Sequence, residues 1–274
     1  MPELPEVETT RRGIEPWLVD QQVERIDIRQ SSLRWPIPVE EMLALQGLVV
    51  RQVRRRAKYL LVDFDHGSAV WHLGMSGSLR LVEKSEPPKK HDHVDWYLEN
   101  GKILRFHDPR RFGALLWQSQ GEPLTQLANL GPEPLEVPDI SGLTAESLYQ
   151  ASRGKRQAVK LFIMDSRIVV GVGNIYANES LFLAGIRPTT PAGKISLARY
   201  ERLLAFIRSV LSKAVEQGGT TLRDFVNSDG SPGYFAQQLN VYGRGGEACP
   251  ACQSTLKEIR LGQRSTVYCA QCQR

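Results

Sequence analysis

The stretch CPACQSTLKEIRLGQRSTVYCAQC, residues 249–272, holds all four cysteines of the 274-residue chain. It contains two C-x2-C pairs separated by sixteen residues. Because two intervening residues let one tight turn aim both sulfurs at the same ion, two such turns joined by a hairpin complete a tetrahedral zinc site. Segments 256–261 and 265–268 read as the strands of that hairpin. The sequence therefore predicts one structural Zn²⁺ with four ligands: Cys249, Cys252, Cys269 and Cys272.

A redox dithiol or a disulfide pair is the alternative interpretation of the same four cysteines. Four thiolates would leave no open coordination position, so a zinc ion held by them is expected to be structural and not catalytic. Arg264 lies at the tip of the predicted hairpin, where the metal would fix its position. Position alone favours a solvated surface arginine there.

The chain upstream of the cysteines begins with a strand-rich part. One helix is predicted from Pro5 to about Leu18, where apolar residues fall near helical spacing. Seven short segments rich in β-branched and aromatic residues follow, separated by turn residues, which is typical of an antiparallel sandwich or barrel. The predicted strands are 23–28, 49–53, 59–64, 69–73, 78–82, 94–98 and 102–106.

A proline-rich stretch at 131–138 separates these strands from a helical part. The predicted helices are 141–151, 157–164, 174–184 and 196–217, with a shorter one near 235–239. The fold class is therefore α+β, with an N-terminal helix, an antiparallel β-sandwich, a helical domain and a β-hairpin zinc finger. The expected division is a sandwich domain at 2–130, a linker at 131–140, a helical domain at 141–242 and a zinc finger at 243–274.

Composition and charge exclude several classes of protein. Hydrophobic residues make up 41% and charged residues 24% of the chain, which excludes a wholly disordered or fibrous protein. No apolar run approaches the ~18 residues that cross a bilayer, and the acidic, proline-containing start is unlike a signal peptide. We therefore expect a cytoplasmic protein with no membrane partner. The net charge of +5 permits a nucleic-acid partner without requiring one.

The N-terminus carries a candidate nucleophile. Met1 precedes the small residue Pro2, and removal of Met1 would expose a secondary amine whose pKa of about 7.7–8.0 leaves part of it neutral. Such an amine can attack an aldehyde-level carbon and form an iminium ion. Glu3 and Glu6 are three residues apart, so a helix would place both carboxylates on one face, able to relay protons. A frayed end with solvated acids is the alternative.

Two clusters of basic residues stand out. Residues 51–58 contain four arginines and Lys58 with no acid, and a solvated face explains them equally well. The turn at 108–113, with sequence DPRRFG, combines two arginines with Phe112, a mixture suited to phosphate contacts and an apolar wedge between bases. Met75 lies between glycines that mark a turn, although methionine is more often core filler.

The segment GVGNIY, residues 171–176, is not a dinucleotide-binding loop, because the third glycine of that motif would fall at Tyr176 and no βαβ unit follows. A glycine turn that opens a helix at Asn174 can still present N–H groups and an amide to a phosphate. With the preceding helix, which carries Lys160, it forms a helix–turn–helix arrangement. The histidines at 91 and 93 suit a turn or a phosphate contact better than a metal site.

Four motifs together resemble the bacterial formamidopyrimidine-DNA glycosylase family along essentially the whole chain. They are PELPEVET at 2–9, DPRRFG at 108–113, GVGNIYANE at 171–179 and the four-cysteine tail, and they occur in the family's order. The resemblance implies a DNA glycosylase and abasic-site lyase that excises oxidised purines such as 8-oxoguanine and formamidopyrimidines. It also implies strand nicking by β,δ-elimination, a monomer, one structural zinc ion and double-stranded DNA carrying oxidised bases or abasic sites as the partner.

The resemblance also assigns roles to individual residues. Pro2 would form a Schiff base with C1′ of the damaged nucleotide, and Glu3, Glu6 and Lys58 would support the chemistry. Void-filling residues would be Met75, Arg110 and Phe112. Contacts to DNA are expected from His91, Arg110, Arg111, Lys160, Asn174, Tyr176 and Arg264. A loop covering the extruded base would include Arg223, Phe225 and Tyr234, with Arg223 standing where a lysine is expected.

Two other functions are open at this stage. An endonuclease VIII-like enzyme would share the fold and the chemistry but prefer oxidised pyrimidines, whereas the leucine after Pro-Glu and the long loop after residue 218 favour purines. A non-catalytic zinc-finger protein would bind DNA without cutting it. A base inside a duplex cannot present its C1′ to an amine, so either enzyme must extrude the nucleotide at a cost of a few kcal/mol.

Overall fold

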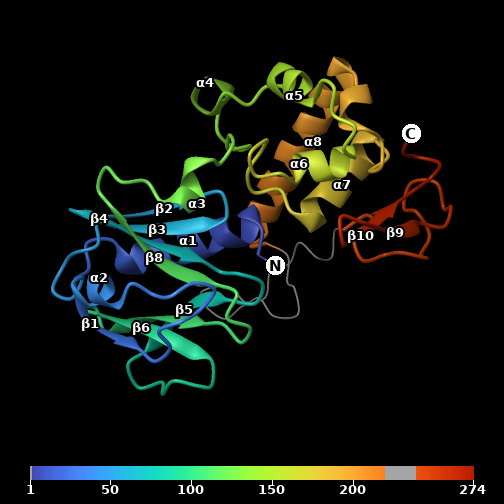
Figure 1. Ribbon diagram of the computed structural model, residues 1–274. Helices are drawn as coiled ribbons and strands as arrows, with labels where there is room; N and C mark the ends of the chain where they lie inside the picture. Colours follow the sequence, from blue (N-terminus) through green and yellow to red (C-terminus); the bar gives the residue numbers. More distant parts are fainter. Residues whose placement is uncertain (1, 220–238) are drawn as a thin grey trace. The chain divides into compact units, whose positions relative to one another are not determined.

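The computed structural model describes residues 2–219 and 239–274, which form two compact units (Figure 1). The first unit contains residues 2–128 and 217–219, and the second contains 129–216 and 239–274. No helix among the described residues is long and apolar enough to span a membrane. The short helix expected near 235–239 falls almost entirely outside the described residues, as does the loop that contains Arg223, Phe225 and Tyr234.

The first unit opens with helix α1, Leu4–Leu18. Glu3 is its N-cap and Glu6 its third residue, and the two form a capping box in which each side chain accepts a hydrogen bond from the other's backbone N–H. This satisfies donors that a helix start otherwise leaves unpaired. The apolar side of α1, including Val7, Ile14 and Leu18, is buried in the core of the unit.

Eight strands of the first unit form two four-stranded antiparallel sheets. The first sheet has the order β1-β6-β7-β5 and the second has the order β2-β3-β4-β8. Their bounds are β1 Val23–Ile28, β2 Gln52–Arg56, β3 Tyr59–Phe64, β4 Gly67–His72, β5 Ser78–Glu83, β6 Asp92–Leu98, β7 Lys102–His107 and β8 Ala114–Ser119. Three short helices are also present: α2 Val39–Leu43, α3 Thr125–Ala128 and, in the second unit, α4 Pro138–Ser141.

One hydrophobic core joins the two sheets and α1 into a sandwich. Trp71 of β4 and Trp96 of β6 come from different sheets, and their ring centroids lie 5.5 Å apart in an edge-on arrangement. Phe106 of β7 packs against Trp71 at 5.3 Å. Aromatic pairs at these distances add to the apolar burial that holds the sheets together. The predicted antiparallel sandwich is therefore confirmed.

The second unit is helical, with a small hairpin at its C-terminal end. Its longest helix buries an apolar stripe that includes Tyr200, Leu203, Ile207 and Leu211, as the helical spacing of these residues predicts. The helices are α5 Ala145–Ser152, α6 Val159–Ile163, α7 Asn174–Ala184 and α8 Leu197–Glu216, with a 3-10 turn at Ala192–Lys194. Strands β9, Lys257–Leu261, and β10, Arg264–Tyr268, pair in the order expected for a hairpin.

The hairpin turn has a backbone reason for its sequence. Gly262 and Gln263 both have positive φ, +55° and +62°. Two-residue turns with both central φ values positive match the twist of antiparallel strands. A Cβ at Gly262 would also press on Leu161, so glycine fits there for two reasons.

Candidate functional site

The first turn of α1 buries the two carboxylates that the sequence singled out. Pro2 is buried, and Glu3 and Glu6 are 2% and 0% exposed. The Glu6 Oε2 atom accepts the backbone N–H of Glu3 at 2.7 Å. The structure thus brings Pro2, Glu3 and Glu6 together in a fixed geometry, as the spacing of three predicted, and a frayed end is excluded for residues 2–6.

Two residues that the sequence did not identify also lie against Glu6. The Thr10 hydroxyl donates to the Glu6 carbonyl at 2.9 Å. Gly219, at φ +79°, packs so closely that a Cβ there would lie 3.1 Å from Glu6 Oε1. Both the positive φ and this close approach favour glycine. The Gly-Gly pair at 218–219 is visible in the sequence, but the sequence does not show that Glu6 is its neighbour.

Lys58 lies in the turn between β2 and β3 and is half-buried. Contacts between α1 and β2 show which end of the helix this turn approaches: Arg11 donates to the Val53 carbonyl at 3.3 Å, and Arg55 pairs with Glu8 at 3.1 Å. Strand β2 and helix α1 therefore run in opposite directions where they touch. The turn after β2 continues toward the first turn of α1, which is the end that carries Glu3 and Glu6.

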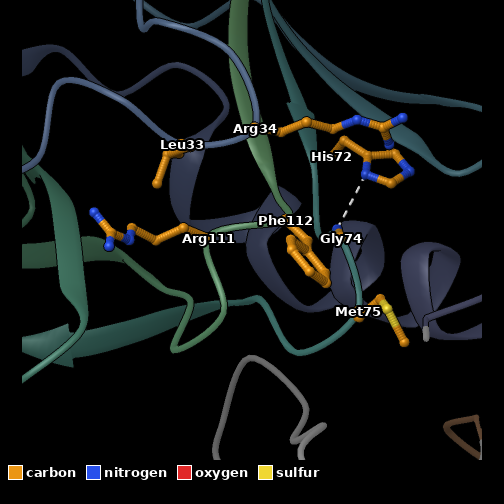
Figure 2. Close-up of a pocket in the computed structure, with 7 residues that line it drawn as sticks. All are labelled: Leu33, Arg34, His72, Gly74, Met75, Arg111 and Phe112. Atoms are coloured by element: carbon orange, nitrogen blue, oxygen red, sulfur yellow. Dashed lines mark hydrogen bonds between the residues drawn. The ribbon is translucent and has the colours of Figure 1, made fainter.

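Two apolar side chains project from neighbouring loops of the first unit. Met75 is 40% exposed and Phe112 is 45% exposed, and Arg110 lies over the Phe112 ring at 4.8 Å. Met75 and Phe112 line one cavity of about 530 Å³, shown in Figure 2. The other residues of its wall are Leu33, Arg34, His72, Gly74 and Arg111. The interpretation of Met75 as core filler is therefore wrong, because its side chain is at the surface of an open cavity.

His72 supplies a neutral imidazole to the wall of this cavity. Burial, with further contributions from Arg34 and Lys58, lowers the pKa of His72 to about 4. Its Nδ1 accepts the Gly74 N–H at 3.0 Å, drawn as a dashed line in Figure 2, so the proton of the neutral ring is on Nε2. No sequence pattern had singled out His72.

Three of the arginines expected to contact DNA are exposed. They are Arg110 and Arg111 in the loop between β7 and β8, and Arg264 at the start of β10. Arg111 has φ +55°, an uncommon value for a residue with a side chain. His91 is half-buried, also with positive φ, at +76°. The three arginines are therefore accessible to solvent, and His91 is partly so.

The helix–turn–helix residues have a different environment from the one expected. Lys160 is 0% exposed, and its Nζ donates to the Ser265 carbonyl at 3.0 Å and to Thr266 Oγ1 at 2.6 Å. Tyr176 is also 0% exposed. The half-buried Asn174 donates from Nδ2 to the same Ser265 carbonyl at 3.1 Å. The burial of Lys160 does not favour the direct phosphate contact expected of it, because its ammonium lies inside the unit and bonds to the hairpin.

Two further residues of α7 that the sequence did not single out act in the same way. The Asn178 Oδ1 atom accepts the Val267 N–H at 2.9 Å. The buried Glu179 carboxylate accepts the backbone N–H groups of residues 240, 241 and 242 at 2.8–2.9 Å. In the sequence, both are polar residues at buried positions of a predicted helix. Their partners could not be identified from the sequence, because they lie 61 to 89 residues away.

The four cysteines converge as predicted. Their Sγ atoms all lie within 4.8 Å of one another. The Cys249–Cys272 and Cys252–Cys269 sulfurs are 3.9 and 3.5 Å apart, too far for a disulfide. A tetrahedral zinc site with Zn–S bonds of about 2.3 Å has sulfurs separated by about 3.8 Å, so the cluster fits Zn²⁺.

Protonation of the cluster is consistent with a cation site. Hydrogen bonding from Ser254 lowers the pKa of Cys252 to about 6. Interaction with Cys252 raises the pKa of Cys272 to about 12. Four sulfurs at this separation therefore cannot all be thiolates unless a cation compensates their charge.

Three family models match the chain, in order along the sequence. They are the formamidopyrimidine-DNA glycosylase N-terminal domain at residues 1–115, the formamidopyrimidine-DNA glycosylase H2TH domain at 130–226, and the zinc finger found in FPG and IleRS at 246–274. A relative from Stutzerimonas stutzeri named formamidopyrimidine-DNA glycosylase is 60% identical over the full length of both chains. A Pseudomonas aeruginosa relative of the same name is 58% identical, again over both full lengths.

Solved structures give the same result. The MutM (FPG) protein of Thermus thermophilus superposes with a TM-score of 0.88 at 35% identity, covering 99% of this chain and 98% of that one. A Lactococcus lactis FPG mutant bound to DNA containing Fapy-dG has a TM-score of 0.91 at 30% identity over both full chains. The wild-type Lactococcus lactis protein, with a TM-score of 0.89 and 30% identity over both full chains, was solved with DNA containing an oxidised pyrimidine.

Proposed function

This chain belongs to the formamidopyrimidine-DNA glycosylase family, and we propose that it excises oxidised purines from duplex DNA through the amine of Pro2 and then nicks the strand. The buried first turn of α1 carries this proposal, because it fixes two carboxylates beside the residue whose amine would react. Removal of Met1 is part of the proposal, since only then is Pro2 the terminal amine.

The chemistry follows from the groups at that turn. The Pro2 nitrogen forms a bond to C1′ as the bond from C1′ to the damaged base breaks, and the base leaves with the electron pair. The nitrogen gives up its proton and the base takes one up, so this exchange leaves the charge balanced. Proton donation from Glu3 to the sugar ring oxygen opens the ring and leaves an iminium ion. Loss of a C2′ proton then expels the 3′ phosphate, and a second elimination expels the 5′ phosphate.

The supporting residues fall into three groups. Glu6 holds the first turn through its bond to the Glu3 N–H, and Lys58 supplies a positive charge toward that end of the helix. The exposed side chains Met75 and Phe112, with Arg110 over the ring, suit filling the gap left by the extruded nucleotide. DNA contacts are proposed for His91, Arg110, Arg111, Asn174 and Arg264, whereas Lys160 and Tyr176, both 0% exposed, are proposed to support this surface from inside the second unit.

A zinc ion held by the four cysteines would stabilise the hairpin without taking part in the reaction. Arg264 begins the second strand of that hairpin, so the ion would fix its place. Arg223, Phe225 and Tyr234 are proposed to cover the extruded base. The functional division proposed is 2–130 for catalysis, 131–140 as linker, 141–242 for DNA binding and 243–274 as zinc finger.

The proposed partner is double-stranded DNA with oxidised bases or abasic sites, bound by a monomer in the cytoplasm, where bacterial chromosomal DNA is found. Relatives solved with damaged DNA support the partner. The solved complex with an oxidised pyrimidine favours a second candidate activity on pyrimidine lesions. Single-turnover excision from 8-oxoguanine·C and thymine-glycol·A duplexes separates the two, and faster excision of thymine glycol would overturn the purine preference.

Borohydride trapping tests the nucleophile. The mature protein is expected to form a covalent adduct with an 8-oxoguanine duplex in the presence of borohydride, which reduces the iminium ion to a stable amine. A matched protein with an uncleaved Gly-Ser extension before Pro2 should bind the same duplex and give no adduct. An adduct of equal yield from the extended protein would show that another amine reacts.

A further inference from the structure

One buried carboxylate connects the two loops that carry the void-filling side chains. The first loop, residues 73–77, joins β4 to β5 and carries Met75. The second, residues 108–113, joins β7 to β8 and carries Arg110 and Phe112. Asp108, which is 0% exposed, begins the second loop and bonds to both.

The bonds of this carboxylate reach each loop separately. Its Oδ1 accepts the hydroxyl of Ser76 at 3.1 Å and, more weakly, the N–H of Arg110 at 3.3 Å. Its Oδ2 accepts the N–H of Gly113 at 2.8 Å. Ser76 is the neighbour of Met75, and Gly113 is the neighbour of Phe112. A single side chain therefore bonds to the residue next to each of the two exposed apolar residues.

Asp108 is itself fixed from the sheet behind it. Its N–H donates to the His91 carbonyl at 3.0 Å, and its own carbonyl accepts from His93 Nε2 at 2.8 Å. The two loops also touch directly, since a Cβ at Gly74 would clash with the backbone of Phe112 and Gly113. The two loops thus pack directly against each other, and the Asp108 carboxylate links them through hydrogen bonds to both.

The charge environment of Asp108 separates it from the two buried aspartates of β6. Asp92 and Asp95 are buried with arginine partners, Arg80 and Arg105. Across residues 2–219 and 239–274, no ion pair to Asp108 is found. Its bonds go to N–H and O–H groups of the two loops, at 2.8–3.3 Å. This arrangement suits alignment of the loops better than stabilisation of the sheet.

The geometry points to Asp108 as a positioning residue that sets Met75 and Phe112 at the spacing needed to occupy the gap in the base stack. The inference rests on the proposed function. A wedge that is already ordered replaces the lost stacking without first paying the entropy of ordering two loops. Loss of the carboxylate should therefore weaken base extrusion while leaving the chemistry at Pro2 in place.

The experiment compares Asp108→Asn with a matched control, Asp63→Asn. Asp63 likewise accepts a buried serine hydroxyl, that of Ser68 at 2.6 Å, but it lies in β3, touches neither loop and, unlike Asp108, also pairs with an arginine, Arg54. An asparagine at 108 keeps an acceptor for Ser76 but presents an N–H₂ group toward the Gly113 N–H. A second pair, Ser76→Ala and Ser68→Ala, removes only one hydroxyl and guards against a folding defect in Asp108→Asn.

Two substrates separate extrusion from chemistry. Single-turnover excision from an 8-oxoguanine·C duplex should fall at least tenfold in Asp108→Asn and about threefold in Ser76→Ala. Nicking of a preformed abasic site in a single strand, which leaves no gap to fill, should stay within twofold of wild type. 2-Aminopurine placed beside the lesion should report slower unstacking in the same two variants. Both controls should match wild type in every assay.

The outcomes are distinguishable. A wild-type protein that does not excise 8-oxoguanine overturns the proposed function and with it this inference. An active wild type whose Asp108→Asn variant matches Asp63→Asn overturns the inference alone. Equal losses on the duplex and on the single strand would show that Asp108 merely supports the fold, and would also overturn it.

Discussion

The first turn of α1 and the first two turns of α7 both bury polar side chains, but they use them differently. In α1, Glu3 and Glu6 bond to the backbone of their own turn, three residues apart. In α7, Asn178 bonds to strand β10 of the hairpin, 89 residues away, and Glu179 bonds to the segment that begins 61 residues away. The bonds from α7 hold distant segments of the second unit together, whereas those within α1 fix the turn at which the proposed reaction would take place.

Glu3→Gln should produce the largest effect, because it separates capping from proton transfer. Glutamine retains an oxygen that accepts the Glu6 N–H, so the start of α1 and the thermal stability should change little. It cannot donate a carboxylic proton, so excision of 8-oxoguanine should fall about 10³-fold, the range of general acid catalysis. Single-turnover kinetics and a thermal melt measure the two quantities.

Glu8→Gln is the control for Glu3→Gln. Glu8 lies on the same helix and pairs with Arg11, Arg12 and Arg55, so its loss should lower stability and leave the excision rate unchanged. Should Glu3→Gln keep wild-type excision, Glu3 would be a cap alone and the comparison between the two helices would fail.

Loss of the zinc ion should produce the next largest effect, on binding. Cys249→Ser removes one of four ligands, and because the ion is expected to hold the hairpin, the affinity for duplex DNA should fall about a hundredfold, or ~2.7 kcal/mol. Zinc content by atomic absorption and binding by fluorescence anisotropy test this. Arg264→Ala is the comparison variant: it should retain zinc and reduce the slope of log K against log salt by about 0.9. Unchanged affinity in the zinc-free variant would contradict the expectation.

Lys160→Met tests whether Lys160 acts as a buried donor to the hairpin. The substitution removes the buried donor to Thr266 Oγ1 and leaves the Ser265 carbonyl with Asn174 Nδ2 alone, and should lower the free energy of unfolding by about 2 kcal/mol. Because the ammonium does not reach the surface, the salt slope of DNA binding should stay at the wild-type value. Urea unfolding measures the first quantity, with the exposed Lys155→Met as the control. A salt slope reduced by about 0.9 would restore a direct phosphate contact.

The same distinction between local and long-range contacts explains how far the sequence predicted the structure. Helix α7 was predicted with its observed bounds, and β1 and β3 also match, because caps, turns and apolar spacing lie within each segment. Strand β2 begins three residues later than predicted. It extends through the arginines at 54–56, which do not have the apolar side chains on which the prediction relied. Strand β8, Ala114–Ser119, was missed: it pairs with β4, some 45 residues earlier, and its own residues carry a weak strand signal.

The candidate site divides in the same way. Pro2, Glu3, Glu6 and the cysteine pairs are close in sequence, so spacing alone brought them together. Asp108 lies within the DPRRFG motif, yet its role depends on Ser76, 32 residues earlier. The partner of Lys160 is 105 residues away. Spacing within one element does not report which element packs against it.

The smallest effect concerns His72, and it extends the comparison to pH. The pKa of His72 is about 4 in the folded chain and ordinarily 6.5, so between these values the unfolded state binds more protons and stability falls as the pH falls. Since one pKa unit corresponds to about 1.4 kcal/mol, lowering the pH from 7 to 5.5 should cost about 1 kcal/mol through this residue.

His72→Gln keeps an acceptor for the Gly74 N–H and cannot titrate, so it should lose less stability than wild type over that interval. Urea midpoints at both pH values measure the difference, and the exposed His66→Gln serves as control. An equal loss in wild type and His72→Gln would mean that His72 is protonated normally, and that the cavity beside Met75 and Phe112 is wetter than its geometry indicates.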